Sequence, residues 1–97
     1  MALTAYMVTY DIADPDRLRK VFQVMRGAGQ HVQFSVFHCL LSDVAVEELS
    51  DALTAVMNLR EDQVLFIDLG PAEGRAATCI RALGQAWKPP ERKAVIL

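Results

Sequence analysis

The junction between a first strand and a first helix constrains the fold of this chain more than any other feature. Residues 3–12 are rich in aromatic and β-branched side chains, which predicts a strand. Asp14 and Pro15 then predict the start of a helix, with Asp14 as its N-cap and Pro15 at the first helical position. Gly27 and Gly29 predict that this helix ends close to them.

The following segments continue the alternation of extended and helical patterns. Residues 32–41 carry large apolar groups on both faces, which predicts an extended segment covered on both sides. Ser42 predicts the start of a second helix with an apolar stripe. Residues 64–69 form a short apolar run that is typical of a buried strand, and residues 78–84 fit either a strand or a helical turn.

This order of elements fits an α+β domain of the ferredoxin-like βαββαβ type, in which an antiparallel sheet carries two helices on one face. The fold requires residues 30–41 to supply two paired strands, although no clean hairpin turn is evident there. We assign residues 1–84 to this domain and residues 85–97 to a C-terminal tail. The sheet face without helices favours self-association.

Composition limits the class of protein. A chain of 97 residues with 53% hydrophobic content predicts one folded domain rather than a disordered segment. No apolar run approaches the ~18 residues that span a membrane, and no secretory signal is visible. Cys39 and Cys79 have no zinc-site spacing, so we expect two buried, reduced thiols in a cytoplasmic protein.

Asp11 is the first candidate for chemistry. Strand alternation places it on the face opposite Val8 and Tyr10, at the end of the predicted strand. A carboxylate there could bind Mg²⁺ or Mn²⁺, and two such carboxylates related by a two-fold axis would make an adequate site. The alternative is that Asp11 only solvates the turn between strand and helix.

Basic residues of the first helix are the second candidate group. The net charge is only −2, but this helix and the tail are basic while the middle of the chain is acidic. The bases could contact phosphates, or they could form the ordinary solvated face of an amphipathic helix. They are Arg17, Arg19, Lys20 and Arg26.

A third group consists of residues that could support such a site. His31 and His38 could act as general bases, although a satisfied structural histidine on a buried segment is the stronger interpretation for His38. Ser35 lacks the setting of a hydrolase nucleophile but could bind a phosphate. Aromatic side chains could stack on bases or pack in the core, and these are Tyr6, Tyr10, Phe34 and Phe37.

Several motifs occur together in a specific order. They are Tyr10-Asp11-Ile12, then Asp14, Arg17 and Lys20-Val21, then Gly29 and Val32-Gln33-Phe34-Ser35-Val36-Phe37. With Asp62 to Gly70 and Ile80 to Gly84, this order resembles the small CRISPR-associated adaptation nuclease family, the smaller of the two core spacer-acquisition proteins.

The resemblance implies a ferredoxin-like homodimer joined through its sheets, with Asp11 of each subunit sharing one Mg²⁺ (or Mn²⁺) ion. It also implies that the tail strand, residues 94–97, completes the sheet of the dimer mate. Family members place phosphate contacts at the first-helix bases, and Tyr10, Ser35, Phe37 and His38 are candidate supporting residues. After Val36-Phe37 the family usually has Glu, whereas this chain has His38.

Two functions follow from the resemblance. The first is a metal-dependent endonuclease that hydrolyses RNA or DNA in spacer acquisition. The second is a non-catalytic dimeric scaffold that binds duplex DNA and bridges a CRISPR integrase. His38 in place of Glu weakens the nuclease interpretation and leaves the scaffold interpretation intact. A metabolite-sensing ferredoxin-like domain is a third interpretation, which no motif supports.

Overall fold

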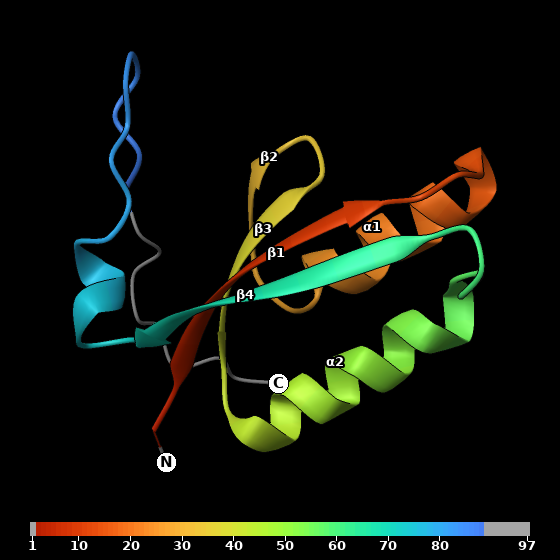
Figure 1. The fold of residues 1–97 in the computed structure, drawn as a ribbon, viewed down its shortest axis with the longest axis horizontal. Helices are drawn as coiled ribbons and strands as arrows, with labels where there is room; N and C mark the ends of the chain where they lie inside the picture. Colours follow the sequence, from red (N-terminus) through yellow and green to blue (C-terminus); the bar gives the residue numbers. More distant parts are fainter. Residues whose placement is uncertain (1, 89–97) are drawn as a thin grey trace.

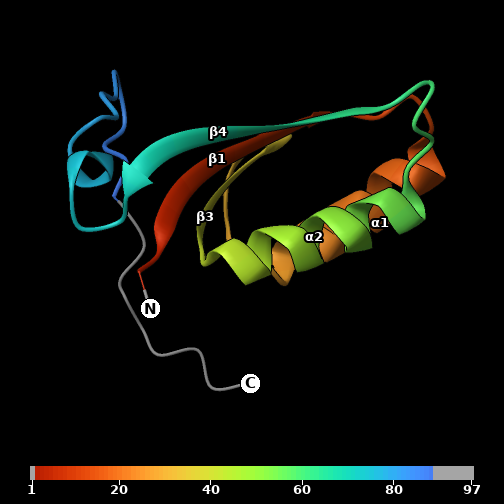
Figure 2. The same cartoon turned by 60° about the horizontal axis from the view of Figure 1, so that its bottom comes forward.

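The computed structural model describes residues 2–88 of the chain, so the predicted strand at residues 94–97 lies outside the described part. Four strands form one antiparallel sheet in the order β2-β3-β1-β4. Both α-helices lie on the same face of this sheet (Figure 1 and Figure 2). The elements are β1 (Thr4–Asp11), α1 (Pro15–Arg26), β2 (Gln30–Gln33), β3 (Val36–Leu41), α2 (Asp43–Val56), β4 (Gln63–Pro71) and a short 3₁₀ helix η1 (Arg75–Ala77). The predicted ferredoxin-like fold is confirmed.

Both helices start where the sequence predicts. The Asp14 carboxylate accepts a hydrogen bond from the Arg17 backbone N–H at 2.9 Å, and Pro15 is the first helical residue. The Ser42 hydroxyl accepts from the Ala45 N–H at 3.1 Å and caps α2 in the same way. Each cap satisfies an N–H group that has no partner inside the helix. The caps therefore fix the points at which the chain leaves β1 and β3.

Residues 32–41 are not one continuous strand. Phe34 and Ser35 form a turn that divides the segment into β2 and β3, with a register shift between His31 and Gln33. The Ser35 carbonyl accepts a hydrogen bond from the Tyr10 N–H at 3.1 Å, so the turn is tied to β1. The hairpin was hard to predict because its turn contains none of the glycine, asparagine or proline residues that usually mark one.

Two further predictions need correction. Residues 64–69 belong to β4, but the strand is buried on one face only, since Leu65 and Ile67 are 47% and 45% exposed. Both point to the helix-free face. Residues 78–84 form neither a strand nor a helix, and the short helix η1 precedes them.

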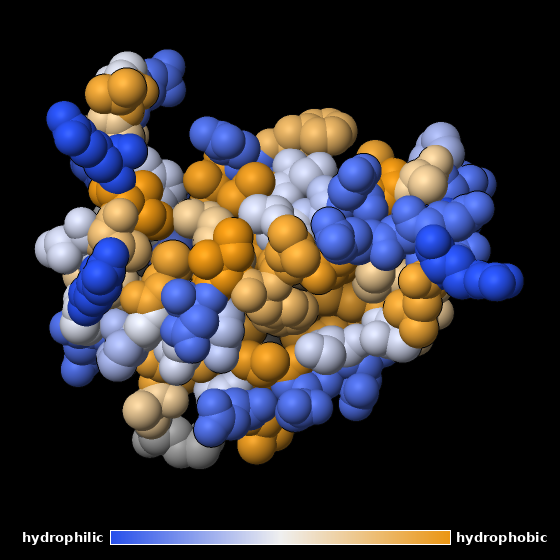
Figure 3. Space-filling view, viewed as in Figure 1, coloured by the Kyte–Doolittle hydropathy of each residue, from blue (hydrophilic) through white to orange (hydrophobic). Residues whose placement is uncertain are grey.

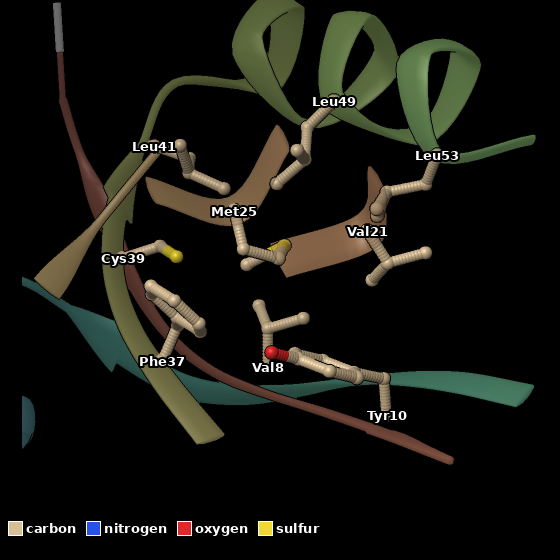
Figure 4. Packing of buried hydrophobic residues seen from close by; sticks show 9 residues of the cluster. All are labelled: Val8, Tyr10, Val21, Met25, Phe37, Cys39, Leu41, Leu49 and Leu53. Carbon is tan, nitrogen blue, oxygen red and sulfur yellow. The ribbon is translucent and has the colours of Figure 1, made fainter. Parts of the chain in front are cut away.

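The core lies between the sheet and the two helices. Figure 4 shows Val8 and Phe37 of the sheet facing Val21 and Met25 of α1, and all four side chains are fully buried. The two cysteines are free, and only Cys39 is fully buried while Cys79 is half-buried. Within residues 2–88 no helix is long and apolar enough to cross a membrane.

Candidate functional site

Asp11 is the last residue of β1 and is exposed. Its neighbours Val8 and Tyr10 are buried against the helices, so Asp11 projects toward the helix-free face, as alternation predicts. Its cross-strand partner is Gln63 at the start of β4. Within residues 2–88 the Asp11 side chain forms no hydrogen bond or ion pair, so its oxygens are free for an external ligand.

One chain offers Asp11 as a lone ligand. The described residues contain no group of three His, Cys, Asp or Glu side chains that could hold a metal ion. Carboxylate oxygen suits Mg²⁺, which commonly keeps several waters and takes only one or two protein carboxylates. The donor chemistry of Asp11 therefore fits a hard divalent cation, but the site needs a second carboxylate from elsewhere.

The helix-free face next to Asp11 is largely apolar. Strand register places Met7 and Thr9 of β1 beside Ile67 and Leu65 of β4, and His38 of β3 opposite Met7. Figure 3 shows apolar side chains over the middle of the sheet. Hydrophilic side chains gather in the same view where β1 passes into α1 and where α2 passes into β4. An apolar surface with a polar end is typical of a protein interface.

The four bases predicted to bind phosphate differ in their surroundings. Arg19 pairs with Asp16 at 2.8 Å, and both side chains are largely exposed. Lys20 is exposed and forms no ion pair in the described chain, and Arg26 is exposed with its guanidinium 6.0 Å from the Phe22 ring centroid. All are on α1, which covers the face opposite Asp11. The carboxylate and the bases thus lie in different layers of the domain.

Arg17 has two carboxylate partners. Its Nε donates to Asp62 Oδ2 at 2.8 Å and its Nη2 donates to Glu61 Oε1 at 3.0 Å. The Asp62 side chain is fully buried, and it also accepts hydrogen bonds from the N–H groups of Ala13 and Asn58 at 2.9 and 2.8 Å. Arg17 holds the pKa of Asp62 well below its usual range, and Asp62 raises the pKa of Arg17.

Sequence reasoning missed this cluster. Glu61 stands out only as a member of the acidic middle of the chain, and Asp62 also as the first residue of the segment from Asp62 to Gly70 that carries the family resemblance. Nothing in the spacing of Asp62 indicates a partner 45 residues away. A signal that points the right way is the position of Asp62 directly before a strand, where a buried carboxylate can collect N–H groups of a turn.

Two of the supporting residues lie in the core. Phe37 is fully buried, Tyr10 is 6% exposed, and their rings stack at 6.3 Å. Burial raises the pKa of the Tyr10 phenol. For both residues the core-packing alternative holds. Tyr6 is half-buried with its ring against Phe66, whereas Phe34 is 79% exposed at the hairpin turn, so core packing is wrong for Phe34.

The histidines occupy contrasting positions. His38 is 3% exposed, lies with its ring 5.3 Å from that of Trp87, and burial lowers its pKa. Its Nδ1 has no hydrogen-bond partner among the described residues. His31 is exposed, packs its ring against Phe22 and Phe37, and has Nε2 3.3 Å from the Phe34 carbonyl. The prediction that His38 is buried is confirmed, but the prediction that its polar atoms are satisfied is wrong for Nδ1 among the described residues.

Comparison with known proteins connects this geometry to a family. The profile of the family described as CRISPR associated protein Cas2 matches residues 4–75. The chain belongs to this family. Its resemblance to the smaller spacer-acquisition proteins is thereby confirmed.

Individual Cas2 proteins are similar over almost the whole chain. A protein of Rhodospirillum rubrum named CRISPR-associated endoribonuclease Cas2 1 is 44% identical, over 96% of this chain and 90% of its own length. The CRISPR-associated endoribonuclease Cas2 of Geobacter sulfurreducens is 38% identical, over 95% and 96%. The crystal structure of Streptococcus pyogenes Cas2 superposes with a TM-score of 0.70 at 29% identity, covering 82% of this chain and 99% of that chain.

Proposed function

We propose that this chain is a CRISPR adaptation protein that acts as a homodimeric, Mg²⁺- or Mn²⁺-dependent endoribonuclease. The observation that carries the proposal is the free carboxylate of Asp11 at the end of an uncovered apolar sheet face. The names of the Rhodospirillum and Geobacter relatives support the choice of RNA as substrate. Two free thiols are consistent with the reducing cytoplasm as the place of action.

Dimerisation through the helix-free faces supplies the second carboxylate. Burying Met7, Leu65 and Ile67 against the same residues of a second copy would remove apolar surface from water. A two-fold axis near the end of β1 would bring the two Asp11 side chains together. In this arrangement the tail, residues 85–97, adds a strand to the partner's sheet.

The proposed chemistry of the site depends on two oxygen ligands, one from each chain. The Asp11 carboxylate of each chain would offer oxygen to the shared ion, and contact between the apolar sheet faces would hold the two chains together. A divalent cation held by the two Asp11 residues would supply a water of lowered pKa and neutralise charge on the phosphate. Within one chain the described residues offer no general base close to Asp11 in the strand register, since His38 is paired to Met7 further along β1.

A non-catalytic scaffold is the second candidate function. It is favoured by the separation between Asp11 and the exposed bases Arg19, Lys20 and Arg26, which lie on α1 in the other layer. A dimer with these bases on its outer surface would clamp duplex DNA without placing it at Asp11, and would present its remaining surface to a CRISPR integrase.

A cleavage assay separates the two functions. Wild type, Asp11→Asn and the control Asp51→Asn, which removes an exposed carboxylate from α2, are incubated with RNA and with duplex DNA in Mg²⁺ or Mn²⁺. The mass of each protein in solution is measured in parallel. The nuclease proposal requires a dimer that cleaves RNA, equal activity of Asp51→Asn, and loss of activity in Asp11→Asn.

Two results contradict the nuclease. If RNA stays intact at concentrations of wild-type protein that bind it, the nuclease activity is excluded. If the protein in the same samples is a dimer that binds duplex DNA, the scaffold function is favoured. Equal cleavage by Asp11→Asn excludes Asp11 as the ligand.

A further inference from the structure

The carboxylate of Asp62 is the most heavily hydrogen-bonded side chain in the described structure. It accepts from the backbone N–H groups of Ala13 and Asn58 and from Nε and Nη2 of Arg17, at distances of 2.8 to 3.2 Å. No part of the side chain is exposed. One carboxylate thus joins the β1–α1 loop, the first turn of α1 and the α2–β4 loop.

These contacts are made close to Asp11, both along its own chain and at its cross-strand partner. Ala13 follows Asp11 by two residues, and Asp62 directly precedes Gln63, the cross-strand partner of Asp11. Because no side chain in residues 2–88 holds the Asp11 carboxylate, the backbone alone fixes the point on the sheet from which this side chain extends. Any shift of the 11–13 segment relative to β4 would therefore move the Cα and Cβ of Asp11, and with them the region that its carboxylate can reach.

Arg17 is occupied by this arrangement. Its guanidinium lies between the carboxylates of Asp62 and Glu61, and its side chain is only 24% exposed. Its positive charge is balanced by two negative charges, so it attracts a phosphate much less than the exposed bases further along α1 do. Its geometry, with two N–H groups on one carboxylate, is that of a structural clamp.

We propose that Asp62 and Arg17 are positioning residues for Asp11, rather than a phosphate contact and a surface acid. They hold the end of β1 in the orientation that allows two Asp11 carboxylates to share one divalent cation. The inference rests on the proposed nuclease function for its catalytic consequence, but not for the effect on the Asp11 backbone. Supporting groups of this kind typically change metal affinity or activity by about 10–100-fold when removed.

The test compares Asp62→Asn, Arg17→Lys and Arg17→Gln with the control Glu61→Gln. Glu61 is exposed and contacts the outer side of Arg17, so its change removes a charge from the same loop and leaves the Asp62 bonds in place. Amide hydrogen exchange is followed at residues 11, 13 and 58, at a temperature where every variant is folded. We expect exchange at these amides to rise about tenfold or more in Asp62→Asn and Arg17→Gln, with less change in Arg17→Lys and none in Glu61→Gln.

The catalytic arm uses RNA cleavage and RNA binding together. If Asp62 only stabilised the fold, variants compared in the folded state would cleave like wild type. As a positioning residue, its change to Asn lowers kcat by about tenfold or more and leaves the RNA dissociation constant within about twofold, with partial recovery in Arg17→Lys compared with Arg17→Gln.

Failure of the inference and failure of the nuclease function give different results. Unchanged exchange at residue 11 in both Asp62→Asn and Arg17→Gln overturns the positioning role, whatever the activity. A wild-type protein that does not cleave RNA overturns the nuclease function. The hydrogen-exchange measurement then still decides whether Asp62 and Arg17 order the backbone of Asp11.

Discussion

Arg17 and Asp62 lie 45 residues apart in the sequence, and Arg17 donates two hydrogen bonds to the one carboxylate, from Nε at 2.8 Å and from Nη2 at 3.2 Å. This contact differs from an ordinary surface ion pair because the carboxylate is fully buried and also accepts two backbone N–H groups. Removal of the Asp62 carboxylate would leave the N–H groups of Ala13 and Asn58 without a partner. The junction of three segments beside Asp11 therefore depends on the charge of Asp62.

The first prediction concerns stability at acid pH. Arg17 keeps the pKa of Asp62 below its usual value, so the unfolded chain binds a proton at this residue more readily than the folded chain does. The stabilisation is fully present above about pH 5 and is lost as the pH falls below about 4, through the usual pKa of an aspartate and toward the lowered one. Urea unfolding from pH 2.5 to 7 measures it.

Asp62→Asn serves as the comparison for this first prediction. Because asparagine does not titrate, the variant is less stable than wild type at pH 7, and the difference between the two narrows as the pH is lowered. A difference that stays constant over the whole range contradicts the role of the charge.

The second prediction concerns the close approach of α1's end to β3. A Cβ on Gly29 would lie 2.5 Å from Cys39 Sγ and 2.6 Å from the His38 carbonyl oxygen, which is closer than any real contact. We expect Gly29→Ala to lower the free energy of unfolding by about 1–3 kcal/mol, since the strand must move to make room. Thermal or urea unfolding measures this.

Gly27→Ala is the matched control for that substitution. At Gly27 the new methyl group would meet only the Val24 carbonyl oxygen at 3.5 Å, and the residue has helical dihedral angles. Its stability should be equal to wild type or slightly higher. Equal stability of the two variants would show that β3 can move away from residue 29 without loss of stability, which contradicts the prediction.

Local signals explain why the helices could be predicted and the hairpin could not. Asp14, Pro15 and Ser42 are capping residues whose effect depends only on neighbours within one turn, and the structure uses all three. The turn at Phe34 and Ser35 has no such residues. This turn is stabilised by contacts across the sheet, namely the hydrogen bond from the Tyr10 N–H to the Ser35 carbonyl oxygen and the pairing of β3 with β1.

The candidate site was predictable to a similar extent. The exposure of Asp11 on the helix-free face follows from strand alternation, which needs no knowledge of the rest of the chain. The partners of Arg17 depend on how the α2–β4 loop packs against α1. The sequence pattern shows an amphipathic helix with four bases but does not indicate which of them is already neutralised. In the structure Arg17 is paired with a buried carboxylate, whereas the other three bases are exposed.

The third prediction concerns nucleic-acid binding by α1. Lys20 is exposed and unpaired in the described chain, and Arg19 has only an exposed, weak partner in Asp16. We expect the double change Arg19→Ala and Lys20→Ala to weaken duplex DNA binding. It should also reduce the slope of log K against log salt concentration by about 0.9 for each phosphate that the variant no longer neutralises. Fluorescence anisotropy at several salt concentrations measures both quantities.

A base at the other end of the sheet provides the control for this third prediction. Arg75 is exposed in η1, after the end of β4, and lies away from α1. Arg75→Ala should change neither the affinity nor the slope beyond a general charge effect. An unchanged slope in the double variant would show that α1 is not the DNA-binding surface.

The last prediction concerns stability near neutral pH and His38. The imidazole is 3% exposed, its neighbours in the sheet are Met7 and Gln30, and the Trp87 ring lies against it, so no carboxylate faces it in the described structure. Burial lowers its pKa, which means that the unfolded chain takes up a proton before the folded chain does.

The sign of the effect follows from that order of protonation. The stability that His38 contributes as a neutral group is present above the unfolded pKa of about 6.5 and is lost as the pH falls through the lowered folded pKa. One proton limits the slope to about 1.4 kcal/mol per pH unit. This window lies above the one in which Asp62 acts, so unfolding measurements between pH 5 and 8 isolate it.

His38→Gln and His31→Gln form the matched pair for this measurement. His38→Gln should abolish the fall in stability between pH 7 and 5, because the titrating group is gone, whereas the exposed His31 should be dispensable for it. The fluorescence of Trp87, the one tryptophan of the chain, follows the same transition at the contact itself. If the slope of unfolding free energy against pH persists in His38→Gln and disappears in His31→Gln, the titrating residue is His31, and the prediction is contradicted.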